Sequence, residues 1–391
     1  MGTATADRAI SAPRLFDGEK WHDDSALLLA GEHVAGVLPR ASLPSTLPCE
    51  TLRKGTLAPG FVDLQANGGG GLLFNNAPTV ETVLHMTSSH RRCGTTALLP
   101  TLLSDTASVM RAGADAVRAA QACGEAAAAG VLGLHIEGPF FAPSRRGTHR
   151  GDRLRSCSAE DIAWLSSLSD LHCLLTVAPE VMAPGQIRQL CTAGLTVFAG
   201  HSDASYEAVQ AARGEGLNGF THLFNAMSPL SAREPGVTGA ALDGTPDWLG
   251  IIADGHHVHP ASIRIAQRCA SPGRLFLVSD AMATVGGGQH WFTLYGERIV
   301  QRNGRLINAE GALAGSAIGL VDAVRYCHDV VGLALDECLR MASRYPARVV
   351  GDKTRGHLQP GARADMVLLG TTLEVAATWL GGVRQDHATL R

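Results

Sequence analysis

Four side chains that could bind a metal or move a proton each follow directly on a short apolar stretch of this chain. They are Glu137, His201, His222 and Asp280. In a barrel of parallel strands the loops open at the carboxyl ends of the strands, so side chains at strand ends meet at one mouth. One glutamate and two histidines form the open ligand set of a catalytic zinc ion, and an aspartate beside them is a candidate base.

The alternative is that these residues are structural or exposed, as most of the 16 histidines must be. A buried carboxylate or imidazole without a partner costs on the order of several kcal/mol, however. Four such groups, each ending a different predicted strand, are therefore hard to explain in a protein core. We interpret Glu137, His201 and His222 as ligands of a divalent metal ion, with Asp280 beside them.

Positive side chains gather in the loops that would surround this mouth. They are Arg145, Arg146, His149 and Arg150 after one predicted strand, Arg233 in a long loop, and His256 and His257 after another strand. Arginine binds phosphate through two parallel hydrogen bonds, so these loops favour an anionic substrate, although solvated loop charge is the alternative. The glycine run at 68–71 lacks the lysine of a phosphate-binding loop, so we do not expect a nucleotide.

The elements that must position these residues alternate between strand and helix from residue 58 onward. Eight apolar stretches have the composition of strands, at 61–64, 95–99, 131–136, 171–178, 195–199, 219–222, 249–253 and 275–279. Repeated strand–helix units with right-handed crossovers make a parallel sheet, and eight of them close as a (β/α)8 barrel. An open, doubly wound sheet is the competing arrangement.

The two chain ends have short strand patterns instead of this alternation. We expect one small β-domain made from residues 1–57 and 351–391, beside a barrel at 58–350. A β insertion into the barrel is expected around 286–311, where Asn303 and Gly304 are typical of a hairpin turn. The fold class is therefore α/β, with a TIM-like barrel and a smaller β-domain.

Composition limits the classes of function. The net charge of −3 gives no electrostatic reason to expect nucleic acid or a membrane surface as partner. The nine cysteines are scattered singly, as in a reducing compartment, and no stretch approaches 18 apolar residues. We expect a cytoplasmic enzyme.

Motifs spread in order from about residue 58 to 369 resemble those of the amidohydrolase superfamily and, within it, the N-acetylglucosamine-6-phosphate deacetylases. They include Ala58-Pro-Gly-Phe-Val-Asp63, His135-Ile-Glu-Gly-Pro139, Gly147-Thr-His149, Ala199-Gly-His-Ser202, Thr221-His-Leu-Phe-Asn-Ala-Met227, Arg233-Glu-Pro-Gly236, Val278-Ser-Asp-Ala281 and Gly361-Ala-Arg-Ala-Asp365. The resemblance implies a (β/α)8 barrel with a small β-sandwich built from both termini. It also implies release of acetate from an N-acetylated hexosamine 6-phosphate.

The resemblance assigns roles to individual residues. Glu137, His201 and His222 would hold the metal, and Asp280 would act as general base and then general acid. His149 would contact the acetyl carbonyl. The sugar would be held by Asn225 and Ala226 and its 6-phosphate by Arg233 and His257, which in a homodimer would reach the site from the neighbouring subunit.

One departure from the wider superfamily concerns the end of the first barrel strand. That strand commonly ends in His-x-His, whereas this chain has Gln65 and Asn67, and neutral amides are poor zinc ligands. We therefore expect one divalent metal ion per subunit, Zn2+ by its ligand set. Gln65, Asn67 and His135 are expected to be auxiliary residues around the ligands.

Three alternatives stay open beside this interpretation. The same chemistry on N-acetylgalactosamine 6-phosphate differs only by a C4 epimer, which the sequence cannot separate. A cyclic-amide hydrolase of the dihydroorotase kind is disfavoured by the missing His-x-His and by Glu-Gly-Pro in place of a bridging lysine. A non-catalytic sugar-phosphate sensor would have no need of Asp280.

Overall fold

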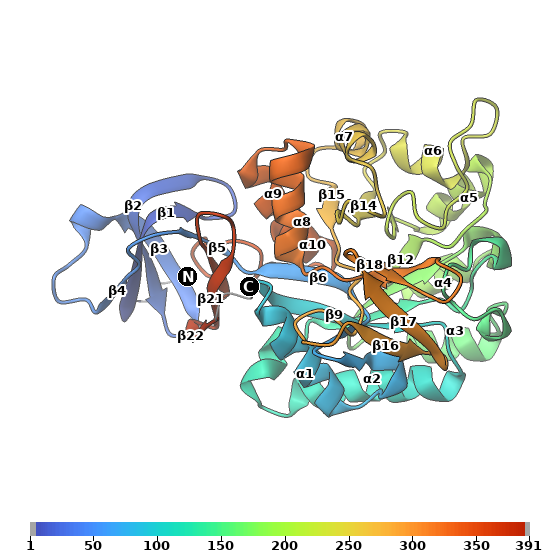
Figure 1. The fold of residues 1–391 in the computed structure, drawn as a ribbon, viewed down its shortest axis with the longest axis horizontal. Helices are drawn as coiled ribbons and strands as arrows, with labels where there is room; N and C mark the ends of the chain where they lie inside the picture. Colours follow the sequence, from blue (N-terminus) through green and yellow to red (C-terminus); the bar gives the residue numbers. More distant parts are fainter. Residues whose placement is uncertain (1–4, 388–391) are drawn as a thin grey trace.

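Residues 5–387 are described in the computed structural model, which consists of a barrel and a smaller β-domain (Figure 1). The barrel strands are β6 (Phe61–Ala66), β9 (Thr95–Leu103), β10 (Gly133–Glu137), β11 (His172–Val177), β12 (Thr196–Ala199), β13 (Gly219–Phe220), β14 (Trp248–Ile251) and β15 (Leu275–Leu277). All pair in parallel in chain order, and the Asp280 amide donates to the Gln65 carbonyl at 2.9 Å across the closure. The predicted (β/α)8 barrel is confirmed, since a doubly wound sheet would reverse its strand order.

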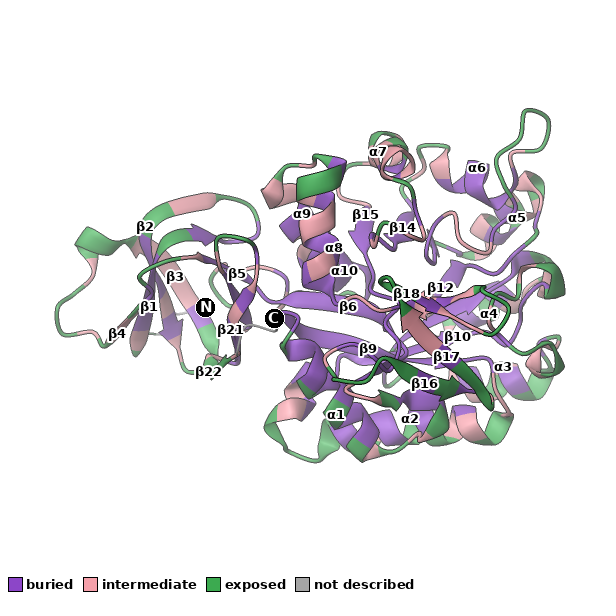
Figure 2. Ribbon diagram, viewed as in Figure 1, coloured by how far each residue is buried: buried purple, intermediate pink, exposed green. Residues whose placement is uncertain are grey.

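Helices surround the barrel on the outside (Figure 1). They are α1 (Val80–Arg91), α2 (Ala107–Ala122), α3 (Ala159–Ser166), α4 (Gln186–Thr192), α5 (Tyr206–Glu215), α6 (Gly236–Leu242), α7 (Pro260–Cys269), α8 (Leu320–Tyr326), α9 (Leu335–Ala342) and α10 (Arg344–Val349). Side-chain caps begin several of them; in α3 the Ser158 and Asp161 side chains bond reciprocally to each other's main chain. The barrel strands between these helices are almost entirely buried, which explains their continuous apolar sequences (Figure 2).

The small β-domain contains strands from both chain ends, as predicted. Its eight strands are β1 (Arg8–Phe16), β2 (Trp21–Ala30), β3 (His33–Pro39), β4 (Cys49–Thr51), β5 (Thr56–Pro59), β20 (Met366–Leu369), β21 (Val375–Leu380) and β22 (Val383–Asp386). The two ends meet where β5 pairs with β1 on one side and β20 on the other. Buried side chains such as Leu27, Leu57 and Trp379 form its separate core.

A four-stranded antiparallel sheet interrupts the barrel after β15. Its strands are β16 (Trp291–Leu294), β17 (Glu297–Arg302), β18 (Arg305–Ile307) and β19 (Leu313–Ser316). The predicted hairpin turn lies between β17 and β18, where Asn303 and Gly304 have φ of 49° and 78°. The Ser316 amide donates to the Asp280 carbonyl at 2.9 Å, so this insertion is attached directly at the carboxyl ends of the barrel strands.

Several strand ends differ from the sequence prediction, and two of these differences bear on the site. Strand β9 continues to Leu103, past the predicted end at 99, because Pro100 is accommodated at an irregularity in the pairing with β6. Strand β13 ends at Phe220, so His222 lies in the turn beyond the strand. In the described part of the chain, the helices lack the length and apolar character needed to cross a bilayer.

Candidate active site

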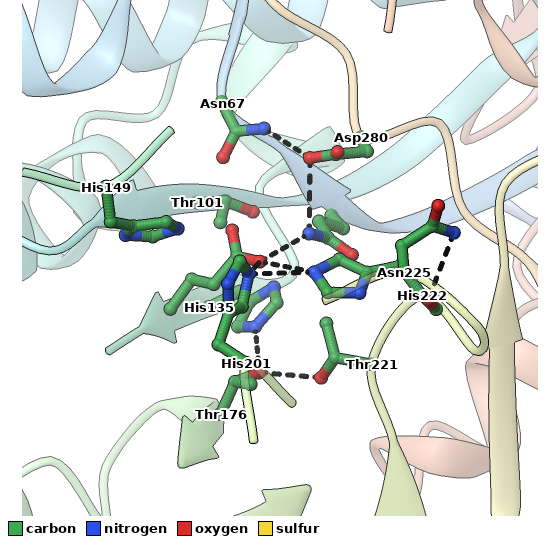
Figure 3. Close-up of polar contacts among 12 residues, drawn as sticks. Asn67, Thr101, His135, His149, Thr176, His201, Thr221, His222, Asn225 and Asp280 are labelled. Carbon is green, nitrogen blue, oxygen red and sulfur yellow. Dashed lines mark hydrogen bonds and ion pairs between the residues drawn. The ribbon is translucent and has the colours of Figure 1, made fainter. Parts of the chain in front are cut away.

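Three predicted ligands lie together at the carboxyl end of the barrel. Oε1 of Glu137 lies 3.2 Å from Nε2 of His201 and 3.0 Å from Nε2 of His222, and the two nitrogens are 3.0 Å apart. All three side chains are buried, and the two imidazole rings stand nearly perpendicular with their Nε2 atoms directed toward each other (Figure 3). One carboxylate oxygen and two imidazole nitrogens at this spacing could hold one divalent cation.

The chemistry of this donor set fits a metal. Nδ1 of His201 lies 2.9 Å from the Arg145 carbonyl, which can only accept, so Nδ1 carries a proton and Nε2 is the nitrogen directed at Glu137 and His222. Burial alone would raise the pKa of Glu137, but hydrogen bonds and charge from His201 and His222 hold that pKa well below its usual range. The glutamate is therefore an anionic ligand. Zinc accepts this combination of ligands with one position left open.

The backbone at these positions is unusual. His201, His222 and Asp280 have φ of 49°, 35° and 50°, in the left-handed region that non-glycine residues rarely occupy. Each follows a barrel strand within three residues. Such backbone strain is concentrated at functional sites, where it aims a side chain that an extended chain would point elsewhere.

Amide side chains hold the Asp280 carboxylate. Its Oδ1 accepts from Nδ2 of Asn67 at 2.7 Å and from Nε2 of Gln65 at 3.2 Å. The same Gln65 nitrogen donates to Oε1 of Glu137 at 2.9 Å, which links the candidate base to the ligand set. Burial, and then repulsion from the Glu137 charge, raise the pKa of Asp280 to about 7. The geometry places a carboxyl group able to exchange protons near neutral pH beside the three ligands.

His149 lies to the left of the ligand set in Figure 3 and lines the same cavity. Its Nδ1 accepts from the backbone N–H of Ser104 at 3.1 Å and lies 2.8 Å from the Ser104 hydroxyl. Since a backbone N–H only donates, Nδ1 is unprotonated and Nε2 carries the hydrogen. Burial, and then the nearby His201 charge, lower the pKa of His149 to about 3. A neutral imidazole here is a hydrogen-bond donor toward the cavity.

Only some of the remaining predicted site residues line the cavity. Asn225, Ala226 and His257 line the cavity with the ligands, so His257 reaches the site of its own chain and not only, as the resemblance implied, that of a neighbouring subunit. His135 is buried and bonded to Thr176 at 2.8 Å, so it supports the strands and does not face the cavity. Arg233 lies outside the cavity lining, in an exposed loop just before α6, the projecting yellow-green loop in Figure 1.

His257 is paired with an acid. Its Nδ1 lies 2.7 Å from Oδ2 of Asp254, and both side chains are largely buried. Burial alone would lower the pKa of His257, but the hydrogen bond and charge of Asp254 raise it. The imidazole is thus a cation over more of the neutral range than an unpaired histidine and offers Nε2–H to a ligand.

Several residues that shape the site were not predicted from the sequence. The Phe141 ring stacks on His201 with centroids 4.3 Å apart, and Ser104 holds His149. Met282, shortly after β15, and Leu313 of the insertion add apolar lining. Ser104 follows a barrel strand like the other site residues, so only the premature predicted end of β9 concealed it.

Comparison with known proteins agrees with this geometry. The model of the amidohydrolase family matches residues 56–384. An N-acetylgalactosamine-6-phosphate deacetylase from a Shewanella species is 42% identical over 86% of this chain and 84% of its own. An N-acetylglucosamine-6-phosphate deacetylase from Haemophilus influenzae is 33% identical over 93% and 95%.

Solved structures give the same result. The crystal structure of N-acetylglucosamine-6-phosphate deacetylase from Pasteurella multocida superposes with a TM-score of 0.93 at 32% identity, covering 97% of this chain and 100% of its own. Both the barrel and the small β-domain are included in that coverage. Together with the family model and the relatives above, this likeness shows that the chain belongs to the amidohydrolase family.

Proposed function

We propose that this enzyme hydrolyses the N-acetyl group of N-acetylglucosamine 6-phosphate, giving glucosamine 6-phosphate and acetate. The observation that carries the proposal is the convergence of Glu137, His201 and His222 on one point, with Asp280 connected to them through Gln65. This arrangement suits attack of water on an amide. Relatives named for this reaction and its galactosamine counterpart support the substrate class.

We assign the metal position to Glu137, His201 and His222, with Zn2+ as the expected ion and one ion per chain. A divalent cation bound there would polarise the acetyl carbonyl and acidify water. Gln65 and Asn67 donate hydrogen bonds to carboxylates in this site, which is a different task from binding a second ion.

Two side chains of the protein then carry out the proton transfers and stabilise the carbonyl oxygen. Asp280 accepts a proton from the attacking water and later donates it to the leaving amine, a cycle suited to a group with a pKa near neutrality. His149 donates its Nε2–H to the carbonyl oxygen as negative charge develops there. Phe141, stacked on His201, holds the plane of that imidazole.

Asn225 and Ala226 are proposed to hold the sugar, and His257 with Arg233 its 6-phosphate. His257 lines the cavity, whereas Arg233 extends from an exposed loop and would serve the site of a neighbouring subunit in a homodimer. Two cationic side chains at the phosphate would balance its two negative charges, which lose their hydration when the substrate binds.

N-acetylgalactosamine 6-phosphate is the second candidate substrate, favoured by the 42% identity to a deacetylase of that name. The deciding experiment measures acetate release by the metal-loaded enzyme from N-acetylglucosamine and N-acetylgalactosamine, each with and without the 6-phosphate. Hydrolysis of a 6-phosphorylated sugar is expected, and the ratio of kcat/KM for the two epimers ranks the candidates. No acetate from either phosphorylated sugar would exclude the proposed reaction.

A further inference from the structure

We propose that Tyr295, in the turn between β16 and β17, is a positioning residue of the active site that acts on His149 through Ser104. The Tyr295 hydroxyl donates to the Ser104 carbonyl at 2.7 Å, across 191 positions of sequence. Ser104 in turn contacts Nδ1 of His149 with its N–H and its hydroxyl. The inference rests on the proposed function, because it concerns the donor that His149 presents to the reacting carbonyl.

The orientation of Ser104 decides which imidazole nitrogen faces the cavity as a donor. With the Ser104 N–H directed at Nδ1, the hydrogen of neutral His149 is on Nε2. The other tautomer would present a lone pair to the carbonyl oxygen, which repels the charge that develops there. A small rotation of the Leu103–Ser104 peptide, which carries this N–H, would therefore remove the stabilisation of that charge.

Ser104 needs support because it lies beyond the end of β9. The strand ladder fixes residues up to Leu103, which pairs with Glu137 of β10. The Leu103–Ser104 peptide, which carries the N–H on His149, is held at the Leu103 carbonyl by Nδ2 of Asn75 at 3.0 Å, and the Tyr295 hydroxyl holds the following peptide at the Ser104 carbonyl. Tyr295 therefore fixes the far side of Ser104, and with it the Ser104 hydroxyl that contacts Nδ1. The insertion sheet thus holds both sides of the active site, since its strand β19 also bonds to the Asp280 main chain.

The conformation of Tyr295 points to a role for its side chain. It occupies the first position of a two-residue turn with φ of 51°, followed by Gly296 with φ of 84°. Such turns favour Asn or Gly, and a bulky residue in the left-handed region is unfavourable. The ring packs on the apolar cluster that contains Leu103, and burial raises the pKa of the hydroxyl, so that it stays a neutral donor.

The test is Tyr295→Phe, which keeps the ring and removes the hydroxyl. With metal-loaded enzyme and a 6-phosphorylated substrate, kcat is expected to fall about 10- to 100-fold, the effect typical of a lost supporting contact. KM should change little, because the contact acts on the transition state. The matched control is Tyr345→Phe, whose hydroxyl bonds to Glu337 at 2.9 Å outside the cavity lining; its kcat should equal that of the parent.

A mutant cycle separates positioning from general stabilisation. If Tyr295 acts through His149, then Tyr295→Phe has no further effect on kcat in the His149→Ala background. Equal fold losses in both backgrounds, or full kcat in Tyr295→Phe alone, would overturn the proposal.

A second measurement needs no substrate and so stays informative even if the proposed reaction is wrong. In metal-loaded enzyme with 15N-labelled histidine, the His149 signals are assigned by comparison with His149→Ala. They are expected to show one tautomer, with the hydrogen on Nε2, in the parent and a mixture in Tyr295→Phe. An unchanged single tautomer in Tyr295→Phe would contradict the positioning role.

Discussion

Nδ2 of Asn67 lies 2.7 Å from Oδ1 of Asp280, so the end of the first barrel strand donates a hydrogen bond to the candidate base. In much of the superfamily that this chain resembles, the same strand end supplies histidines for a second metal. Here Asn67 and Gln65 orient carboxylates with their N–H groups. The exchange of imidazole for amide therefore turns two possible ligands into hydrogen-bond donors.

The first prediction follows from this relationship. Elemental analysis of active enzyme should find about one tightly bound divalent metal per chain, because Gln65 and Asn67 are occupied as donors and are poor ligands. Glu137→Ala should lose that metal and the activity together. Two equivalents in active enzyme, both lost in Glu137→Ala, would contradict the single-site interpretation.

Asp280→Asn is expected to fold and to bind metal but to lose activity about 10²–10⁴-fold, the usual contribution of a positioned general base. The isosteric amide can keep a contact with Asn67 but cannot accept a proton. Turnover and metal content measured on the same sample check this. Turnover close to that of the parent enzyme would remove Asp280 from the mechanism.

The pH dependence gives a related test. Because the pKa of Asp280 is raised to about 7 before any cation binds, and a cation would lower it, kcat/KM should decline as pH falls below neutrality. The direction of the change in kcat/KM follows from the role of Asp280 as general base, since only the deprotonated carboxylate accepts a proton. A kcat/KM that rises on acidification through this range would indicate a protonated group in that role.

The fold was largely predictable because a barrel repeats one unit. Each β/α repeat carries its own apolar strand; Glu137 ends one of them, and His201, His222 and Asp280 follow three others within three residues. The supporting contacts were not predictable. Tyr295 contacts Ser104 only because the insertion folds over the strand ends. Neither a tyrosine nor a serine indicates a catalytic site by its residue type alone. Arg233 lies in an exposed loop outside the cavity lining, and no periodic pattern in the sequence indicates where such a loop lies relative to the site.

The Asp254–His257 pair predicts a pH-dependent stability. Burial alone would raise the pKa of Asp254, but the His257 contacts lower it to about 2, whereas the pKa of His257 is raised above 6.5. The contribution of the depressed acid is present above about pH 4 and is lost as pH falls through 2. That of the raised histidine is full below 6.5 and is lost as pH rises through its folded value.

Asp254→Asn should therefore destabilise the protein most between about pH 4 and 6.5, by about 1–3 kcal/mol, and less on either side. Denaturant unfolding of both proteins across pH measures the difference. Asp152→Asn is the control, since Asp152 is exposed and its partner Arg150 does not titrate near neutrality. A difference that stays constant up to pH 9 would show that His257 does not contribute as a cation.

The last prediction concerns the phosphate. Arg233→Ala should lower kcat/KM for the 6-phosphorylated sugar by at least about tenfold, the scale of a lost charge-assisted hydrogen bond. Activity on the unphosphorylated sugar should hardly change, because that substrate does not use the contact. An equal loss on both sugars would mean that Arg233 supports the site's structure and does not bind the phosphate.

Because Arg233 lies outside the cavity of its own chain, we expect it to act in the site of a neighbouring subunit. Mixing Asp280→Asn chains with Arg233→Ala chains tests this. In a hybrid dimer, the chain that keeps Asp280 would receive the intact arginine from its partner, so activity should return on mixing. Verified subunit exchange without recovered activity would place the phosphate contact within one chain, and Arg233 would then have to move into the cavity when substrate binds.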